Sequence, residues 1–297
     1  MRINPQYIQN LVSAANQNAA NQQRYGTELA TGVSVNSLSD NPSAASQDFL
    51  LRSEVSANDN FVQTASGVTG ALQVTDTALG SVVSQITQAI SLATEGNNGT
   101  LNSSDRSSIA NQLSGVRSEI LSLANTSYQG QFVFSGSQTS TQPFTLDTST
   151  TPSTVVYSGD TVQNSIQSPS GQNFALNVPG NQIFGSGTTG ILATLSNLIA
   201  SFSSGSSDIA DTTALNTKLQ NISQQRVIID NSISGLQSAS TYTQNQTTQL
   251  QAVQNTLVQA NTTQVATELS ASETQGTALL DTIAALDQQP TLFTILK

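Results

Sequence analysis

Cysteine, histidine and tryptophan are absent from this 297-residue sequence. Without cysteine the chain can form neither a disulfide framework nor a thiolate metal site. Without histidine as well, the common pairs of nucleophile and general base, and most transition-metal sites, cannot be assembled from its side chains. We therefore expect no enzymatic activity, no cofactor and no metal site.

Charged and aromatic residues are scarce, at 9% and 5% of the sequence, and the formal net charge is −10. An acidic chain lacks the basic face that neutralises phosphates, so the sequence predicts no binding to nucleic acid. Apolar residues make up only 36% of the chain, which is too few for one large compact core. We expect an elongated molecule in which each element buries a narrow stripe.

Long apolar runs are also missing, and no stretch approaches the length of a transmembrane helix. The N-terminal sequence MRINPQYIQNLV lacks the basic and then apolar segments of a secretory signal. We therefore expect no membrane insertion, and a chain that is either cytoplasmic or exported without a cleaved signal.

The two ends of the chain carry heptad patterns, in which the stripe positions alternate in steps of three and four. The N-terminal stripe is formed by Ile8, Leu11, Ala15, Asn18, Gln22, Tyr25 and Leu29, and the C-terminal stripe by Val265, Leu269, Ser272, Gly276, Leu279, Ile283 and Leu286. Similar stripes run within residues 43–95 and 215–236. Sustained heptads predict coiled-coil packing, with an ordinary helical bundle as the alternative. We expect the N- and C-terminal arms to pair as an elongated antiparallel helical rod.

The segment ELATGVSVNSLSDNPSAAS, residues 28–46, predicts an interruption of the first arm. Gly32 is suited to end a helix, Asp40 or Asn41 to cap the next one, and Pro42 to occupy its first turn. A matching break in the other arm is expected near residues 259–264, where the register of the stripe shifts.

A second interruption is predicted at GNNGT, residues 96–100, because glycine and asparagine tolerate the left-handed turn that ends a helix. Ser104 or Asp105 is expected to cap the following helix. Its apolar stripe runs through residues 109–123.

The hydrophobic period changes between Gln131 and about Gln182. Short apolar or alternating segments, such as QFVFSG and TVVYSGD, are separated there by turn residues. We expect a small β-rich module at the tip of the helical hairpin, with aromatic side chains supplying most of its core. These are Phe132, Phe134, Phe144, Tyr157, Phe174 and Phe184.

Three segments resemble the bacterial flagellin family. Residues 29–46 are similar to the family's turn L-x-x-G-x-x-V-N-x-x-x-D-x-P-x-A, and its marked positions include Gly32, Val35, Asn36, Asp40, Pro42 and Ala44. Residues 265–297 look like the family's C-terminal helix with its T-E-[LV]-S step, here Thr267 to Ser270. YQGQFVFSGSQTSTQPF at 128–144, with YSGD at 157–160, resembles the β domain of the junction-forming branch of the family rather than that of filament flagellins.

This resemblance implies a structural subunit of the bacterial flagellum that leaves the cell through the type III export channel. It implies a ring of copies that forms a junction layer, with hook-associated protein 1 below, flagellin above, and an export chaperone in the cytoplasm. The expected domains are a terminal helical domain at 1–40 and 262–297, a helical rod at 41–130 and 190–261, and an outward-facing β domain at 131–189. Short helices with narrow stripes are marginal alone, so we expect the terminal domain to be disordered in the monomer.

The assembly contacts that the resemblance implies fall in three groups. The seam comprises Ile8, Leu11, Tyr25, Leu29, Val265, Leu269, Leu279, Ile283 and Leu286, and the inter-subunit turn comprises Gly32, Val35, Asn36, Asp40 and Pro42. The apolar tail Leu292, Phe293, Ile295 and Leu296 is expected to pack on an adjacent chain, with simple fraying as the alternative.

Two other functions are open on the sequence alone. The chain could be a filament flagellin, which would share the architecture and differ in its partners. It could also be a stalked, adhesin-like module whose β domain binds a sugar or a surface.

Overall fold

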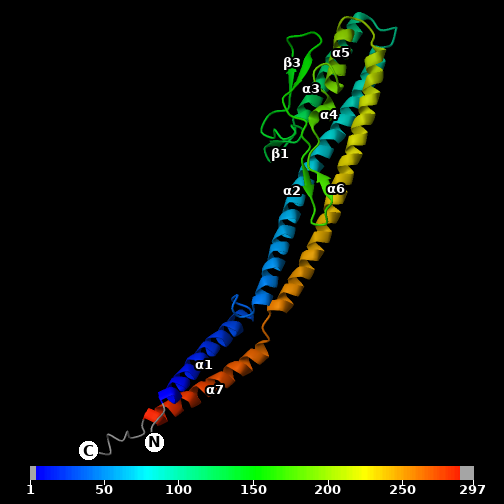
Figure 1. Ribbon diagram of the computed structural model, residues 1–297. Helices are drawn as coiled ribbons and strands as arrows, with labels where there is room; N and C mark the ends of the chain where they lie inside the picture. Colours follow the sequence, from blue (N-terminus) through cyan, green and yellow to red (C-terminus); the bar gives the residue numbers. More distant parts are fainter. Residues whose placement is uncertain (1–4, 288–297) are drawn as a thin grey trace, which may run out of the picture. The chain divides into compact units, whose positions relative to one another are not determined.

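The computed structural model describes residues 5–287 (Figure 1). Its helices are α1 (Pro5–Thr31), α2 (Pro42–Gly96), α3 (Ser103–Ala124), α4 (Gly180–Phe184), α5 (Ile191–Ser203), α6 (Ile209–Val258) and α7 (Thr262–Asp287). The chain divides into two compact units. The terminal unit contains residues up to Ser56 and from Gln246 onward, and the central unit contains Ala57–Asn245. The predicted mainly helical chain with a β insertion is confirmed.

The interruption between α1 and α2 lies where the sequence predicts it. Helix α1 ends at Thr31, and Gly32 follows in the left-handed region with φ 71°. Helix α2 begins at Pro42, and the Asn41 side chain accepts a hydrogen bond from the backbone N–H of Ala44 at 3.1 Å. Asn41 is therefore the cap, and Asp40 belongs to the preceding turn. The matching break lies between the end of α6 at Val258 and the start of α7 at Thr262.

The break between α2 and α3 is placed correctly, but the predicted cap is wrong. Helix α2 ends at Gly96, and the Asn102 side chain, rather than Ser104 or Asp105, caps α3 by accepting from the Asp105 N–H at 2.9 Å. The turn from Asn98 to Leu101 closes early enough to leave Asn102 in an extended conformation. A cap residue needs that conformation to direct its side chain at the free N–H groups of the first turn.

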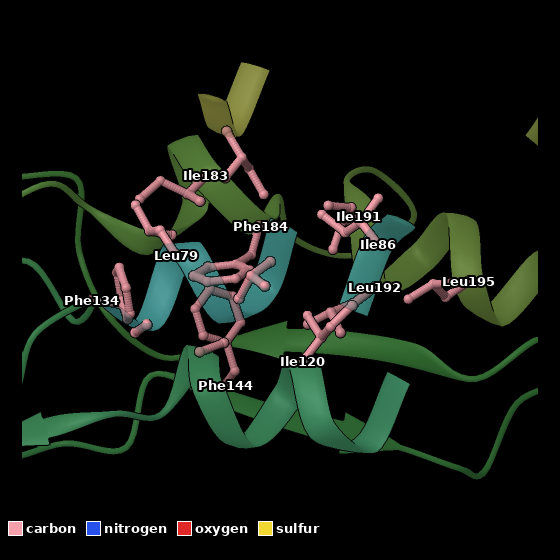
Figure 2. Close-up of a cluster of buried hydrophobic side chains, with 14 of the residues drawn as sticks. Leu79, Ile86, Ile120, Phe134, Phe144, Ile183, Phe184, Ile191, Leu192 and Leu195 are labelled. Carbon is pink, nitrogen blue, oxygen red and sulfur yellow. The ribbon is translucent and has the colours of Figure 1, made fainter. Parts of the chain in front are cut away.

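The core of the central unit is formed by aliphatic side chains of α2, α3, α5 and α6 and by phenylalanine rings from the segment between α3 and α5. Figure 2 shows Leu79 and Ile86 of α2 beside Ile120 of α3, with the rings of Phe144 and Phe184 nearby. These side chains are fully buried. Burial of each such side chain contributes roughly 1.5–3 kcal/mol, so this cluster holds α2, α3 and the inserted segment together.

Within the described residues, the strands form three antiparallel two-stranded sheets. The pairs are β1 (Ser127–Tyr128) with β2 (Gln131–Phe132), β3 (Phe144–Asp147) with β4 (Thr154–Tyr157), and β5 (Ser165–Gln167) with β6 (Asn173–Ala175). Of the six aromatic residues predicted as core, Phe134, Phe144 and Phe184 are fully buried, and Phe132, Tyr157 and Phe174 are half-buried.

The β segment differs in position from the expectation that it caps the helical hairpin. Tyr128 rests on α2 at Gly70, and Phe174 rests on α6 at Gly235, so the segment lies along the sides of these helices (Figure 1). The end of the central unit is formed instead by Gly96, which contacts Phe202 of α5, and by Asn97, which hydrogen-bonds Asp208 and Thr212. The reason is that α3 turns back from the end of α2 and the strands follow it, and α5 then returns the chain to that end, where Phe202 contacts Gly96.

An ion pair joins α2 to α6 inside the central unit. The Arg226 guanidinium donates two hydrogen bonds to the Asp76 carboxylate, at 2.7 and 3.0 Å. Arg226 occupies a stripe position that would otherwise be apolar, and its guanidinium lies beside Gly80, 3.6 Å from the place where a Cβ would stand. A two-bond arginine–carboxylate pair is geometrically specific, and it therefore fixes the register of the two helices.

The motifs FSG and YSGD meet in one hydrogen-bonded cluster. The Tyr157 hydroxyl lies 3.0 Å from the carbonyl oxygen of Phe134 and 2.8 Å from that of Asp160. The Asp160 carboxylate accepts hydrogen bonds from the backbone N–H of Ser137 at 2.8 Å, from the Ser137 hydroxyl, and from the N–H of Val162 at 3.0 Å. These bonds tie the turn after β2 to the turn after β4.

The Asp160 cluster makes a pH-dependent contribution to stability. Hydrogen bonds from the Ser137 hydroxyl and backbone lower the pKa of Asp160 from its usual 3.8. A carboxyl group whose pKa is lower in the folded state stabilises the fold above its unfolded pKa, and this stability is lost as pH falls through the folded pKa. We expect Asp160→Asn to reduce the loss of unfolding free energy on acidification.

The measurement is urea unfolding followed by circular dichroism, at intervals from about pH 3 to pH 7. Asp59→Asn, on an exposed position of α2, is the matched control and should keep the wild-type pH dependence. Equal acid sensitivity of wild type and Asp160→Asn would contradict the assignment.

Candidate assembly surfaces

Helices α1 and α7 lie side by side in the terminal unit (Figure 1). The middle of their contact is polar. The Gln22 side-chain amide donates to the Asn18 side chain at 2.8 Å and to the carbonyl oxygen of Ser272 at 3.0 Å. A Cβ at Gly276 would lie 2.9 Å from the amide atoms of Asn18 and Gln22, so the glycine lets the helices approach. Buried polar contacts of this kind fix the register of paired helices.

The apolar residues predicted for the seam are unevenly covered. Val265 is buried; Leu11, Tyr25, Leu269, Leu279 and Ile283 are half-buried; Ile8 and Leu29 are 41% and 40% exposed. The side chain of Leu286, and the predicted tail Leu292, Phe293, Ile295 and Leu296, lie outside the described residues. One copy of the chain therefore leaves part of its apolar seam open to solvent.

The two breaks in the arms are bonded to each other. The backbone N–H and the hydroxyl of Ser34 both donate to the carbonyl oxygen of Val258, at 2.7 and 3.0 Å. The N–H of Ala260 donates to the carbonyl oxygen of Gly32 at 2.9 Å, and Val33 pairs with Gln259 in antiparallel fashion. This bridge satisfies backbone groups that the ends of α1 and α6 leave free. Sequence reasoning located both breaks without showing that they pair.

The predicted inter-subunit turn is held by side chains of the turn itself. The Asp40 carboxylate accepts from the backbone N–H groups of Asn36 and Ser37, at 3.0 and 2.7 Å. The hydrogen bond from the Ser37 backbone is the largest cause of a lowered pKa at Asp40. The Asn36 amide donates to the carbonyl oxygen of Val33 at 2.8 Å. Val35 is half-buried, whereas Asn36, Asp40 and Pro42 are exposed, so the turn is internally ordered and accessible.

An apolar patch beside this turn was missed in the sequence. It consists of Leu38, Phe49 and Leu50, which are 70%, 72% and 65% exposed. Leu38 and Phe49 border a hollow of about 490 Å³ that also contacts Asp48 and Arg52, whose side chains pair at 2.7 Å. The available signal was the neighbouring pair Phe49–Leu50, because adjacent helical residues point in different directions and cannot both face one narrow seam.

The side chains that form these surfaces are mainly apolar, amide and hydroxyl groups, with Asp40, Asp48 and Arg52 as charged members. Among residues 5–287, no three carboxylates gather closely enough to hold a metal ion. No helix in the same range has both the length and the apolar content required to cross a bilayer.

Comparison with known proteins finds similarity over less than half of the chain. Residues 3–139 match the family model described as the bacterial flagellin N-terminal helical region. Flagellar hook-associated protein 3 of Escherichia coli K12 is 36% identical over 143 residues, which cover 46% of this chain and 44% of that protein. Flagellar hook-associated protein 3 of Salmonella typhimurium LT2 is 35% identical over 151 residues, covering 48% and 46%. The matched region thus spans less than half of each relative.

Comparison of structures extends the likeness to a larger share of the chain. A solved structure of a Vibrio parahaemolyticus protein, assigned to the flagellar hook-associated class, has a TM-score of 0.63. The match covers 74% of this chain and 99% of the other, and the two sequences are 24% identical, so this likeness concerns the fold. Residues 3–139 are thus similar to the N-terminal helical region of bacterial flagellins, and the fold of the chain is similar to that of the Vibrio protein.

Proposed function

We propose that this chain is a structural subunit of the bacterial flagellum, and that a ring of copies forms the junction layer between hook-associated protein 1 and the flagellin filament. The proposal assigns it an extracellular place in the flagellum after export without a cleaved signal, assisted by a cytoplasmic chaperone. Its role is to make contacts rather than to catalyse a reaction.

The observation that carries this proposal is the incomplete seam of the terminal unit. Ile8 and Leu29 lie on the predicted pairing stripe of α1 and remain 41% and 40% exposed in a single copy. Burial of the apolar surface that a helix pair leaves exposed has a favourable free energy, so contact with another apolar surface is stabilising. Copies packed in a ring would supply that cover, and the exposed patch of Leu38, Phe49 and Leu50 would add a contact to the next subunit.

Replacement of both Ile8 and Leu29 by serine is expected to block incorporation while leaving the monomer nearly as stable as wild type. Because each residue is already about two-fifths exposed in one copy, its replacement removes less burial there than it would at a fully buried position. The same substitutions would remove the apolar contact that neighbouring copies in the ring are proposed to complete. The measurement is the amount of chain in flagella isolated from bacteria whose own junction gene is replaced by the variant. We expect at least about a tenfold decrease, as the loss of about 1.4 kcal/mol or more implies.

The control is Ile209→Ser, which removes a 68% exposed apolar side chain from the start of α6. It should be incorporated normally. Chain secreted into the medium is measured in parallel, because a variant that fails in export would otherwise resemble one that fails in assembly. Normal incorporation of the double variant would overturn the role of the seam, and growth of long filaments from the purified chain on seeds would favour a filament flagellin.

A further inference from the structure

The central unit contains a hollow of about 340 Å³ between α2 and the β segment. One wall is the face of α2 that carries Thr64, Gly67 and Ala71, and the opposite wall is the β1–β2 hairpin with Tyr128 and Gln131. Its volume falls at the lower end of the range of small-molecule sites, roughly 300–1,000 Å³. The hollow is separate from the surfaces that carry the proposed function.

The hollow exists because α2 has small residues on this face. No atom lies within 4 Å of the place where a Cβ would stand on Gly67, so that glycine opens onto free space. At Gly70 a Cβ would lie only 2.5 Å from the Tyr128 hydroxyl, so the tyrosine rests directly on the helix. The two glycines therefore have different effects. The missing side chain of Gly70 allows Tyr128 to pack on the helix, and the missing side chain of Gly67 leaves the neighbouring space empty.

The lining is neutral and carries unused hydrogen-bonding groups. It contains no Asp, Glu, Lys or Arg side chain. Within residues 5–287, the Tyr128 hydroxyl and the side-chain amides of Gln129, Gln131 and Asn164 have no hydrogen-bond partner. Each amide offers both donors and an acceptor. Phe132 and Leu176 add apolar surface to the same walls.

We propose that this hollow is a binding site for an uncharged carbohydrate. A sugar ring presents hydroxyl groups at its edge and C–H groups on its faces, and the amides and the tyrosine and phenylalanine rings match both. Anionic ligands are disfavoured, because the lining supplies no cation and the chain has a net charge of −10. Strand addition by a peptide is disfavoured as well, because it requires an open sheet edge and β1 and β2 are two residues long.

The test is binding of the full-length chain to an array that carries neutral, sialylated and sulfated oligosaccharides, followed by calorimetric titration of the strongest neutral glycan. Gly67→Leu fills the hollow, and we expect it to weaken binding at least about tenfold because its side chain takes the volume that the sugar needs. Gln131→Ala, which removes a free amide from an exposed position, should weaken binding severalfold without changing the fold.

Gly115→Leu is the matched control, because Gly115 is likewise an exposed helical glycine with no atom within 4 Å of its would-be Cβ. It lies on α3, outside the hollow, and should bind as wild type does. Selective binding to neutral glycans that Gly67→Leu loses and Gly115→Leu keeps would support the site. Absence of glycan binding, binding to acidic glycans alone, or equal binding by both leucine variants would overturn it.

Discussion

Phe144→Ala is expected to lower the free energy of unfolding of the central unit by about 3–5 kcal/mol. Phe144 is fully buried, and its ring centre lies 4.9 Å from that of Tyr157 and 5.3 Å from that of Phe184. Gly180 packs against the edge of the ring, where even a Cβ would lie 2.7 Å from Cε2. Alanine would leave a cavity between elements that are fixed by their own hydrogen bonds and cannot collapse into it.

The effect of Phe144→Ala should be concentrated in the β segment. Phe144 opens β3 and pairs directly with Tyr157 of β4, so its loss would weaken the contact of both strands with α2 and α3. Because two units need not unfold together, one global transition is not assumed. Urea unfolding by circular dichroism should therefore be combined with hydrogen exchange of peptides from residues 127–175, which reports opening of this segment alone.

Val156→Ala is the control for this prediction. Val156 lies on β4 next to Tyr157 but is 48% exposed. Its truncation should change stability by no more than about 0.5–1 kcal/mol, as at surface positions generally. If the two alanine variants were destabilised equally, the assignment of Phe144 to the centre of the core would be incorrect.

The helix boundaries could be predicted because their causes are local. Gly32 ends α1 and Pro42 begins α2 through properties of their own backbones. Gly96 is the last residue of α2 but does not adopt a left-handed conformation, and its missing side chain instead leaves room for the Phe202 ring. The cap of α3 was missed because Asn102, Ser104 and Asp105 are all good capping residues. Only the turn before them, closed by Leu101, decides which one has the extended backbone.

The parts that could not be predicted depend on contacts between distant residues. The bridge from Ser34 to Val258 joins positions that are 224 residues apart, and the Arg226–Asp76 pair joins positions 150 apart. Nothing in either local sequence marks its partner. The exposed patch at Phe49 and the hollow beside Gly67 are likewise defined by what neighbouring segments leave uncovered, and periodicity does not describe that.

The heptad pattern predicted the partner helices better than it predicted their energetics. Helices α1 and α7 do pair, but the middle of their contact consists of Asn18, Gln22 and Gly276 rather than large apolar side chains. Such a contact specifies register at the expense of stability. That balance suits helices whose remaining apolar surface is proposed to be covered by other copies.

Gly136→Ala is expected to destabilise the central unit by about 3 kcal/mol, combining backbone strain with the loss of hydrogen bonds to a charged group. Gly136 has φ 73°, a left-handed conformation that costs a residue with a side chain about 1–2 kcal/mol. Its Cβ would also lie 2.6 Å from the carbonyl oxygen of Asp160 and closer still to the Asp160 carboxylate. The carboxylate would have to move, and its hydrogen bonds to Ser137 would be lost.

Gly130→Ala separates the two contributions. Gly130 has nearly the same conformation, with φ 79°, but no atom lies within 4 Å of its would-be Cβ. It should therefore show the backbone strain alone, about 1–2 kcal/mol, and the difference between the two variants in urea unfolding should report the Asp160 contact. That difference should shrink at a pH low enough to protonate Asp160, because the bonds that Gly136→Ala breaks are strongest to the ionised carboxylate. Equal destabilisation by the two variants at neutral pH would show that the contact between FSG and YSGD does not stabilise this fold.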